Sequence, residues 1–292
     1  MLDDVIGYLA CPYCADGLAR AGGSLRCAAG HTFDIARQGY VSLLPAGATG
    51  GAGDSAAMVA ARAEFLAAGH FAPLAHELTG AVDLPDGVPG CVADAGAGTG
   101  YFLAAVLDRW PGRAGLALDV SKFALRRAAR AHPRIGAAGC DVWRQLPVAD
   151  GAAAALLSVF APRNGAELRR VLHPRGQLLV VTPEPGHLGE LIGPLGLLRV
   201  DRHKDERLAA QLGGHFAVSA RRPHVRRLRL SHPEVAALVA MGPSARHLEA
   251  GPLAARLAVL PDPVPVTVDV TLTAYKPRVP VVTHGDPHPA AG

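Results

Sequence analysis

Val92-Ala93-Asp94-Ala95-Gly96-Ala97-Gly98-Thr99-Gly100 is the stretch that decides the fold of this 292-residue chain. An apolar run enters it and a helical pattern, Phe102–Trp110, follows it, so the glycines fall in a turn between a strand and a helix. Glycine lets the backbone approach a ligand closely, and the amides that open a helix attract an anionic group. Several nucleotide-binding folds use such a turn, so the glycines alone do not identify the ligand.

Three acids narrow the choice of ligand. Asp94 directly precedes the glycines, where a carboxylate repels phosphate. S-adenosylmethionine (SAM) has no phosphate and carries an ammonium, a carboxylate and a sulfonium. Asp119 ends the next apolar run, Gly115–Leu118, and is placed to accept both ribose hydroxyls, while Asp141 follows as a partner for the adenine amino group. We therefore predict a SAM site; an ordinary glycine turn with surface acids and a nicotinamide site are the alternatives.

Apolar runs and helical patterns alternate through the middle of the chain. Ser121–His132 is a predicted helix with Ser121 as its N-cap, and Ala152–Val159 and Gln177–Thr182 are predicted buried strands. Val264–Tyr275 alternates polar and apolar residues, which favours a late antiparallel strand. The pattern predicts an α/β fold: a Rossmann-like, mostly parallel, doubly wound sheet over residues 81–278.

The segments before and after this domain differ in composition. Residues 45–57 are rich in Gly and Ala and are a predicted linker or active-site loop. Residues 55–80 are predicted to be helical with a break near Gly69, so that 45–80 form a linker and helical segment bordering the cofactor site. Residues 279–292 are rich in Pro, His and Gly and are a predicted disordered tail.

Residues 1–44 carry a metal-binding pattern. The spacing is Cys11-x2-Cys14-x12-Cys27-x3-His31. Three thiolates and an imidazole suit a tetrahedral Zn²⁺, and four protein ligands leave no open position, which predicts a structural site. A lone redox pair, Cys11 and Cys14, is the alternative. Because so small a module lacks a large core, we expect loss of the metal to unfold residues 1–44 and leave the SAM domain folded.

Bulk properties bound the function. The formal net charge of +4 is weakly basic and permits an anionic partner without requiring one. No apolar run reaches the roughly 18 residues that a bilayer-spanning helix needs. The first residues, MLDDVIGYLACPYC, include two acids and lack the basic start of a secretory signal. A cytoplasmic enzyme without a membrane partner is the expectation.

Six segments together resemble a known family. They are CPYC…LRCAAGHTFDIARQGYVSLL, GDSAAMVAARAEFLAAGHFAPL, VADAGAGTGYF, LDVSKFALRRAARAHP, LSVFAPRN and VTPEPGHLGEL. The chain is similar, from about residue 8 to 278, to the large-subunit rRNA guanine-N1 methyltransferases, which include housekeeping-type and tylosin- and mycinamicin-resistance enzymes. The Ala- and Arg-rich composition is typical of a high-GC actinomycete and favours the resistance-type branch.

The resemblance implies a fold, a substrate and site residues. It implies a zinc-binding N-terminal domain on a SAM methyltransferase domain, acting on N1 of a guanine in a 23S rRNA hairpin loop beside the peptide exit tunnel. It also suggests a homodimer. The family's zinc ligands carry over to Cys11, Cys14, Cys27 and His31, and its cofactor contacts to Phe71, Gly98, Thr99 and His187. The family often has Tyr where this chain has Phe71, which can only stack or pack.

The catalytic residues are left open. In related methyltransferases the loop after the fourth strand holds the target base; here that loop contains Arg163 and Asn164, candidate donors to guanine O6, although Arg163 is equally placed to bind a phosphate or cap a helix. Glu184, after the next strand, is a candidate base, and water is the alternative.

Arginines predict where RNA binds. Three lie in the zinc module: Arg20, Arg26 and Arg37. A denser group lies later in the chain: Arg221, Arg222, Arg226, Arg227 and Arg229. For this later group, the solvated edge of a strand is the alternative interpretation.

Two rival functions remain. A small-molecule SAM methyltransferase with a bracing zinc fits the turn and Asp119 equally well, although such enzymes usually close their pocket with a helical lid. A non-catalytic zinc- and RNA-binding protein with a relic cofactor fold is the second, and the intact acids and glycines at positions 94–119 weigh against it.

Overall fold

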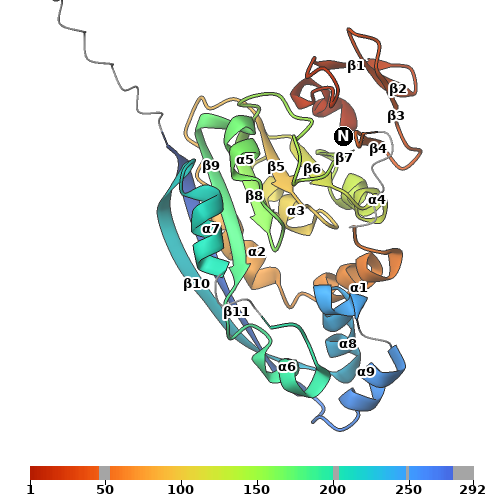
Figure 1. Cartoon of the computed structure of the whole chain (residues 1–292), viewed down its shortest axis with the longest axis vertical. Helices are drawn as coiled ribbons and strands as arrows, with labels where there is room; N and C mark the ends of the chain where they lie inside the picture. Colours follow the sequence, from red (N-terminus) through yellow and green to blue (C-terminus); the bar gives the residue numbers. More distant parts are fainter. Residues whose placement is uncertain (46–52, 200–203, 248–249, 279–292) are drawn as a thin grey trace, which may run out of the picture.

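One eight-stranded sheet organises the molecule. The computed structural model describes residues 1–45, 53–199, 204–247 and 250–278. The strand order is β10-β11-β9-β8-β5-β6-β7-β4, and the sheet twists through the molecule from one end to the other (Figure 1). β5 (Cys91–Ala95) lies near the centre. The chain runs from it to β6 (Gly115–Asp119) and β7 (Ile135–Gly139) on one side, then crosses to β8 (Ala153–Val159) and β9 (Leu172–Pro183) on the other.

Those five strands are parallel to one another, and the ends of the sheet are formed by other segments. β4 (Tyr40–Ser42) is parallel to β7 at one end. At the other end β11 (Val264–Pro277) is antiparallel to β9, and β10 (Phe216–Leu230) is antiparallel to β11. Parallel strands bring their carboxyl ends to one edge of the sheet, and folds of this kind bind their ligands at that edge where the strand order reverses, here at β5.

Helices cover both faces, as the apolar strands require. One core contains residues of α1 (Ala56–Ala67), α2 (Ala72–Ala81), α3 (Tyr101–Arg109), α4 (Lys122–Ala131), α6 (Gly189–Leu195), α8 (His232–Ala240) and α9 (Ala250–Leu257). The second core contains residues of α5 (Gly165–Val171) and α7 (Lys204–Leu212), together with the N-terminal segment. Alternation along β5 explains the division, because Val92 belongs to the first core while Cys91 and Ala93 belong to the second.

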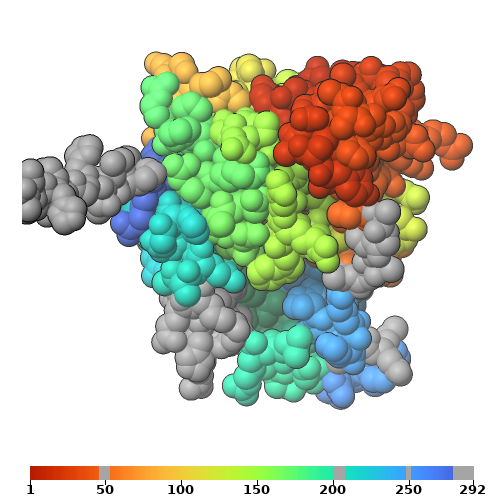
Figure 2. All heavy atoms as spheres, turned by 45° about the horizontal axis from the view of Figure 1, so that its top comes forward, coloured from red at the N-terminus to blue at the C-terminus, as the bar shows by residue number. Residues whose placement is uncertain are grey.

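The N-terminal module packs directly onto the second face. It contains two 3-10 turns, η1 (Leu2–Asp4) and η2 (Ile6–Tyr8), and a three-stranded antiparallel sheet: β1 (Leu18–Ala21), β2 (Ser24–Cys27) and β3 (Thr32–Asp34). Figure 2 shows its red spheres pressed against the central, yellow-green part of the chain. A Cβ at Gly136 of β7 would lie 2.2 Å from Val5 Cγ2, so glycine is what lets the module approach the sheet.

The module does not have a hydrophobic core of its own. Its apolar residues share one core with Leu116, Leu118 and Ala138 of the central strands, and β4 belongs to the central sheet itself. Because unfolding of residues 1–44 would uncover apolar surface on the sheet, we expect loss of the metal to destabilise the SAM domain as well.

Most elements follow the sequence prediction. The predicted strands and helices at the glycine turn, at β6, α4, β8, β9 and β11 are present, and the helical segment breaks where Gly69 has a φ of 83°. The structure adds β7, whose Ile-Gly-Ala-Ala-Gly sequence carries little signal, and the 15-residue strand β10. The tail at 279–292 and residues 46–52 of the predicted linker lie outside the described residues.

Candidate functional site

The four predicted metal ligands converge. Their ligand atoms all lie within 4.8 Å of one another. Cys11 and Cys14 lie on one tight turn, closed by the Ala15 N–H donating to Cys11 O at 2.9 Å. Cys27 ends β2 and begins a matching turn, in which the Gly30 N–H donates to Cys27 O at 3.0 Å and brings back His31. The β1–β2 hairpin connects these two turns and brings them side by side.

The spacing of these atoms suits zinc. Cys14 and Cys27 Sγ are 3.7 Å apart, and His31 Nδ1 is 3.3 Å from Cys27 Sγ and 3.5 Å from Cys11 Sγ. Tetrahedral zinc places two sulfurs about 3.8 Å apart and a sulfur and a nitrogen about 3.6 Å apart. The spacing of these atoms is thus close to that of a filled site, and Nδ1 is the nitrogen of His31 that lies beside the two sulfurs.

The predicted cofactor residues gather at the carboxyl edge of the parallel strands. Asp94 and the glycine turn (residues 96–100) end β5, Asp119 ends β6, and Asp141 follows β7. The next two strands on the other side of β5, β8 and β9, are followed directly by Phe160 and Glu184. The carboxyl ends of five parallel strands, between positions 94 and 184, therefore lie along one edge of the sheet. The strand order reverses at β5, because β6 and β7 lie on one side of it and β8 and β9 on the other.

Asp94 is buried and lacks a full set of partners. Its side chain is 2% exposed, and Oδ1 has no hydrogen-bond partner among the described residues. Burial, and then the charge of Asp119, raise the pKa of Asp94 to about 7. A buried carboxylate that lacks a partner is a high-energy group that a cationic ligand stabilises. SAM, through its ammonium, is such a ligand.

Asp119 fixes the glycine turn as well as facing the site. Its Oδ2 accepts from the Gly98 N–H and its Oδ1 from the Ser121 N–H, both at 2.8 Å. Burial raises the pKa of Asp119, and the two N–H donors oppose that rise. A carboxylate has about four acceptor positions, so two remain for ribose hydroxyls after these bonds are made.

The turn is shaped so that only glycine fits. Gly96, Gly98 and Gly100 have φ values of 83°, 55° and 80°, in the left-handed region. A Cβ at Gly96 would lie 2.5 Å from Ala161 Cβ, and one at Gly100 would lie 3.1 Å from Ala128 Cα. The turn is thus held between the loop after β8 and helix α4, with its buried amides at the start of α3.

An arginine that the sequence did not indicate reaches this turn from α1. Arg62 forms an ion pair with Asp54 and donates to Met241 O at 2.8 Å. A Cβ at Gly98 would lie 3.3 Å from Arg62 Nη1, so the guanidinium lies over the glycines. Ser121 Oγ donates to Asp54 O at 2.6 Å, which ties the end of the predicted linker to the same site. No motif marks Arg62, because only the folded chain brings α1 over the turn.

Three rings form a cluster at the other side of the site. Phe71 is the N-cap of α2, Phe160 follows β8 and His187 follows β9. The centroid of the Phe160 ring is 6.2 Å from that of Phe71 and 6.1 Å from that of His187. His187 Nδ1 accepts from the Asp269 N–H at 3.2 Å, which orients its ring. Phe71 and His187 were predicted from the family; Phe160 was not.

The three catalytic candidates lie in different environments. Arg163 is 8% exposed, its Nη2 donates to Val181 O at 3.5 Å and its Nε has no partner among the described residues. Burial lowers the pKa of Arg163 to about 10, so it remains a cation at neutral pH. Asn164 caps α5 by accepting from the Glu167 N–H, and its Nδ2 donates to Trp143 O. Glu184 is half-buried at the end of β9.

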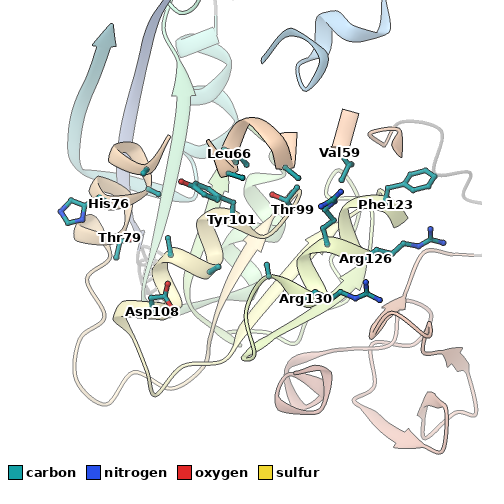
Figure 3. A pocket seen from close by; sticks show the side chains of 18 of the residues that line it. Val59, Leu66, His76, Thr79, Thr99, Tyr101, Asp108, Phe123, Arg126 and Arg130 are labelled. Carbon is teal, nitrogen blue, oxygen red and sulfur yellow. The ribbon is translucent and has the colours of Figure 1, made fainter. Parts of the chain in front are cut away.

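A groove of about 1060 Å³ opens beside the turn, between α1 and α2 on one side and α3 and α4 on the other (Figure 3). Thr99 and Tyr101 contribute to its floor, and Arg126, Arg127 and Arg130 form a cationic wall on α4. Among the residues that the structure describes, none of these three arginines forms an ion pair with a carboxylate. These three arginines were not among those predicted from the sequence to bind RNA.

Comparisons with known proteins agree with this site. The zinc-ribbon family described as RlmA, N-terminal, matches residues 9–49. A putative 23S rRNA (guanine-N1-)-methyltransferase of Micromonospora griseorubida is 53% identical over 95% of this chain and 100% of its own length. The 23S rRNA (guanine(748)-N1)-methyltransferase of Streptomyces fradiae is 51% identical over 95% of this chain and 99% of its own. The chain belongs to the 23S rRNA (guanine-N1-)-methyltransferase family.

A more distant member of the family is the putative enzyme YxjB of Bacillus subtilis, 33% identical over 62% of this chain and 66% of its own length. Membership makes the chain a SAM-dependent methyltransferase with a zinc ribbon and confirms the predicted fold class, enzyme class and cofactors. Among the residues of the present chain that the structure describes, no helix is both long and apolar enough to span a bilayer.

Proposed function

We propose that the chain transfers the methyl group of SAM to N1 of a guanine in a hairpin loop of 23S rRNA, at the position equivalent to guanine 748 of the Streptomyces fradiae relative. The observation that carries this proposal is similarity over 95% of this chain and at least 99% of each relative, zinc ribbon included, at 51% and 53% identity. A small-molecule methyltransferase would share the cofactor turn but has no need of that ribbon.

The residues at the strand edge suit this cofactor. Asp94 is placed to receive the ammonium, the amides of the glycine turn the carboxylate, Asp119 the ribose and Asp141 the adenine amino group. SAM, when bound, supplies the activated methyl group, so the protein contributes position and electrostatics. The zinc site, with four protein ligands, has a structural role.

The guanine must lose its N1 proton during transfer. Negative charge then develops on O6, and Arg163, a buried cation with an Nε that lacks a partner, is the candidate to stabilise it. Glu184 remains the candidate base at the neighbouring strand end, with water as the alternative. Asn164 is a weaker candidate, because binding O6 would cost it the hydrogen bond from Nδ2 to Trp143 O.

Two arginine groups lie at opposite ends of the sheet. Arg26 and Arg37 are exposed on the zinc module, near the β4 end, while Arg20 is paired with Asp3 at 2.6 Å. The cluster at Arg221–Arg229 lies on edge strand β10, seven strand steps from β4, or roughly 34 Å away. We propose that RNA binds the zinc module and the α4 wall, and that the β10 arginines form a solvated edge.

Primer extension tests the proposal. Purified protein, SAM and unmodified ribosomal RNA are incubated, and reverse transcriptase is run across the hairpin. N1 methylation blocks Watson–Crick pairing, so we expect a strong stop next to guanine 748. Labelled SAM that binds without any transfer to RNA would favour the non-catalytic alternative. A stop at another guanine would retain the activity and reject the position.

Three further expectations belong to the same proposal. Cells expressing the protein should tolerate tylosin- or mycinamicin-type macrolides, as the family resemblance implies. The place of action is the cytoplasm, where the rRNA lies. The chain acts as a homodimer that holds one hairpin, which light scattering with and without RNA will test.

A further inference from the structure

Phe160 adopts a backbone conformation that is unusual for a bulky residue. Its φ is 54°, in the left-handed region, where only Ala15 and Leu188 join it among the described non-glycine residues. A bulky side chain in that region is strained. Strain of this kind is normally offset by burial, yet the Phe160 side chain is 40% exposed. An exposed aromatic ring held in a strained conformation is therefore a candidate binding group.

The surrounding structure imposes that conformation. The Phe160 N–H donates to Val181 O at 3.2 Å, which keeps its backbone on β9. The next residue, Ala161, is pressed against Gly96, where a Cβ would lie 2.5 Å from Ala161 Cβ. Phe160 thus projects from a segment fixed between the cofactor turn and β9, one residue from the place where the cofactor approaches.

The ring of Phe160 is also oriented by its neighbours. It is inclined by 27° to the His187 ring and by 39° to the Phe71 ring, with centroid distances of 6.1 and 6.2 Å. His187 is itself fixed by the Asp269 N–H, and Phe71 packs edge-on against Phe65 with centroids 5.4 Å apart. At these separations the two neighbours hold the ring but leave much of it uncovered.

We propose that Phe160 is the platform on which the target guanine stacks while its N1 faces the methyl donor. A base splayed from a loop needs a flat apolar surface to replace the neighbours that it leaves. The exposed ring meets that need, at the strand edge where the cofactor residues gather. Arg163, the candidate donor to guanine O6, lies three residues further along the same loop. This inference rests on the proposed function.

The test compares ring removal with ring retention. We expect Phe160→Leu, which keeps the backbone strain and an apolar side chain, to lower kcat/KM for a 23S rRNA hairpin by about 5- to 150-fold, the range for loss of one base–aromatic stack. Phe160→Tyr should stay within about threefold of the wild type. Phe102→Leu is the matched control, because that ring packs edge-on against Tyr101 in α3, and it should change kcat/KM less than twofold.

Two readouts separate stacking from a structural role. The Kd for SAM, measured by calorimetry, should be unchanged in Phe160→Leu; a parallel loss would assign the ring to the cofactor and overturn the proposal. The Kd for the hairpin should rise in Phe160→Leu while the Tm of the protein stays that of the wild type; a lowered Tm with an unchanged Kd for the hairpin would assign the ring a structural role and overturn the proposal.

The outcome also separates this inference from the function on which it rests. If the wild type neither binds nor methylates the hairpin, both fail. If the wild type methylates the hairpin and Phe160→Leu does so equally well, only the stacking platform is rejected.

Discussion

Replacing Asp119 by alanine tests the cofactor site at the carboxylate that binds the glycine turn and the start of α4. The carboxylate holds the buried Gly98 and Ser121 N–H groups, and we propose that its remaining acceptor positions bind the ribose. Asp119→Ala therefore has two separable effects. It leaves two backbone donors without partners in the free protein, and it removes the ribose acceptor in the complex.

The size of each effect follows from the contacts. A buried donor left without a partner costs about 1–3 kcal/mol, so two would destabilise the fold by about 2–6 kcal/mol, with the lower end expected if water enters the vacated space. Loss of the ribose hydrogen bonds should weaken SAM binding by a further 1–3 kcal/mol, or about 5- to 150-fold in Kd. The free energy of unfolding and the Kd are measured by denaturant titration and calorimetry.

Matched variants make the result interpretable. Asp119→Asn keeps one acceptor oxygen and should fall between the wild type and Asp119→Ala in both measurements. Asp86→Ala removes an exposed aspartate from a surface turn and should change neither. A folded Asp119→Ala protein with the wild-type Kd for SAM would show that the ribose has another partner and would refute the assignment.

Three further predictions concern the metal, the buried acid and the RNA surface. Cys14→Ser should abolish the one zinc per chain and lower the Tm of the whole protein, because the module shares its core with the central sheet; full zinc content by elemental analysis, or an unchanged Tm, would contradict this. Asp94, with its pKa raised to about 7, is mostly protonated in the free protein below that pH, so SAM affinity should rise with pH from 5 through 7 and level off only above that pKa; Asp94→Asn should flatten the profile, and a profile that rises equally in both proteins would exclude Asp94 as the ammonium ligand. Arg26→Ala with Arg37→Ala should weaken RNA binding and reduce its salt dependence by about one counterion per lost phosphate contact, with the Kd for SAM and the Tm unchanged; the paired control is Arg221→Ala with Arg222→Ala on β10, and equal effects of the two pairs would reject the RNA-reading role of the module.

Local sequence was sufficient for the cofactor turn and the metal ligands. A strand, three glycines and a helix within one segment define the turn, because each requirement is met by residues close in the chain. The zinc ligands were equally readable, since two short turns joined by a hairpin fix their spacing. Asp119 was predicted because the strand–helix alternation brings the end of β6 beside the end of β5.

Contacts between segments distant in the sequence could not be predicted, and they determine which side chains surround the glycine turn. Only the folded chain places Arg62 of α1 over Gly98, or brings Phe71, Phe160 and His187 into one ring cluster. The sequence also did not show that Val5 packs where Gly136 leaves room, and so that the module and the sheet share a core. The physical reason is the range of the interactions: turn geometry and metal-ligand spacing are local, whereas packing depends on which surfaces the whole fold brings together.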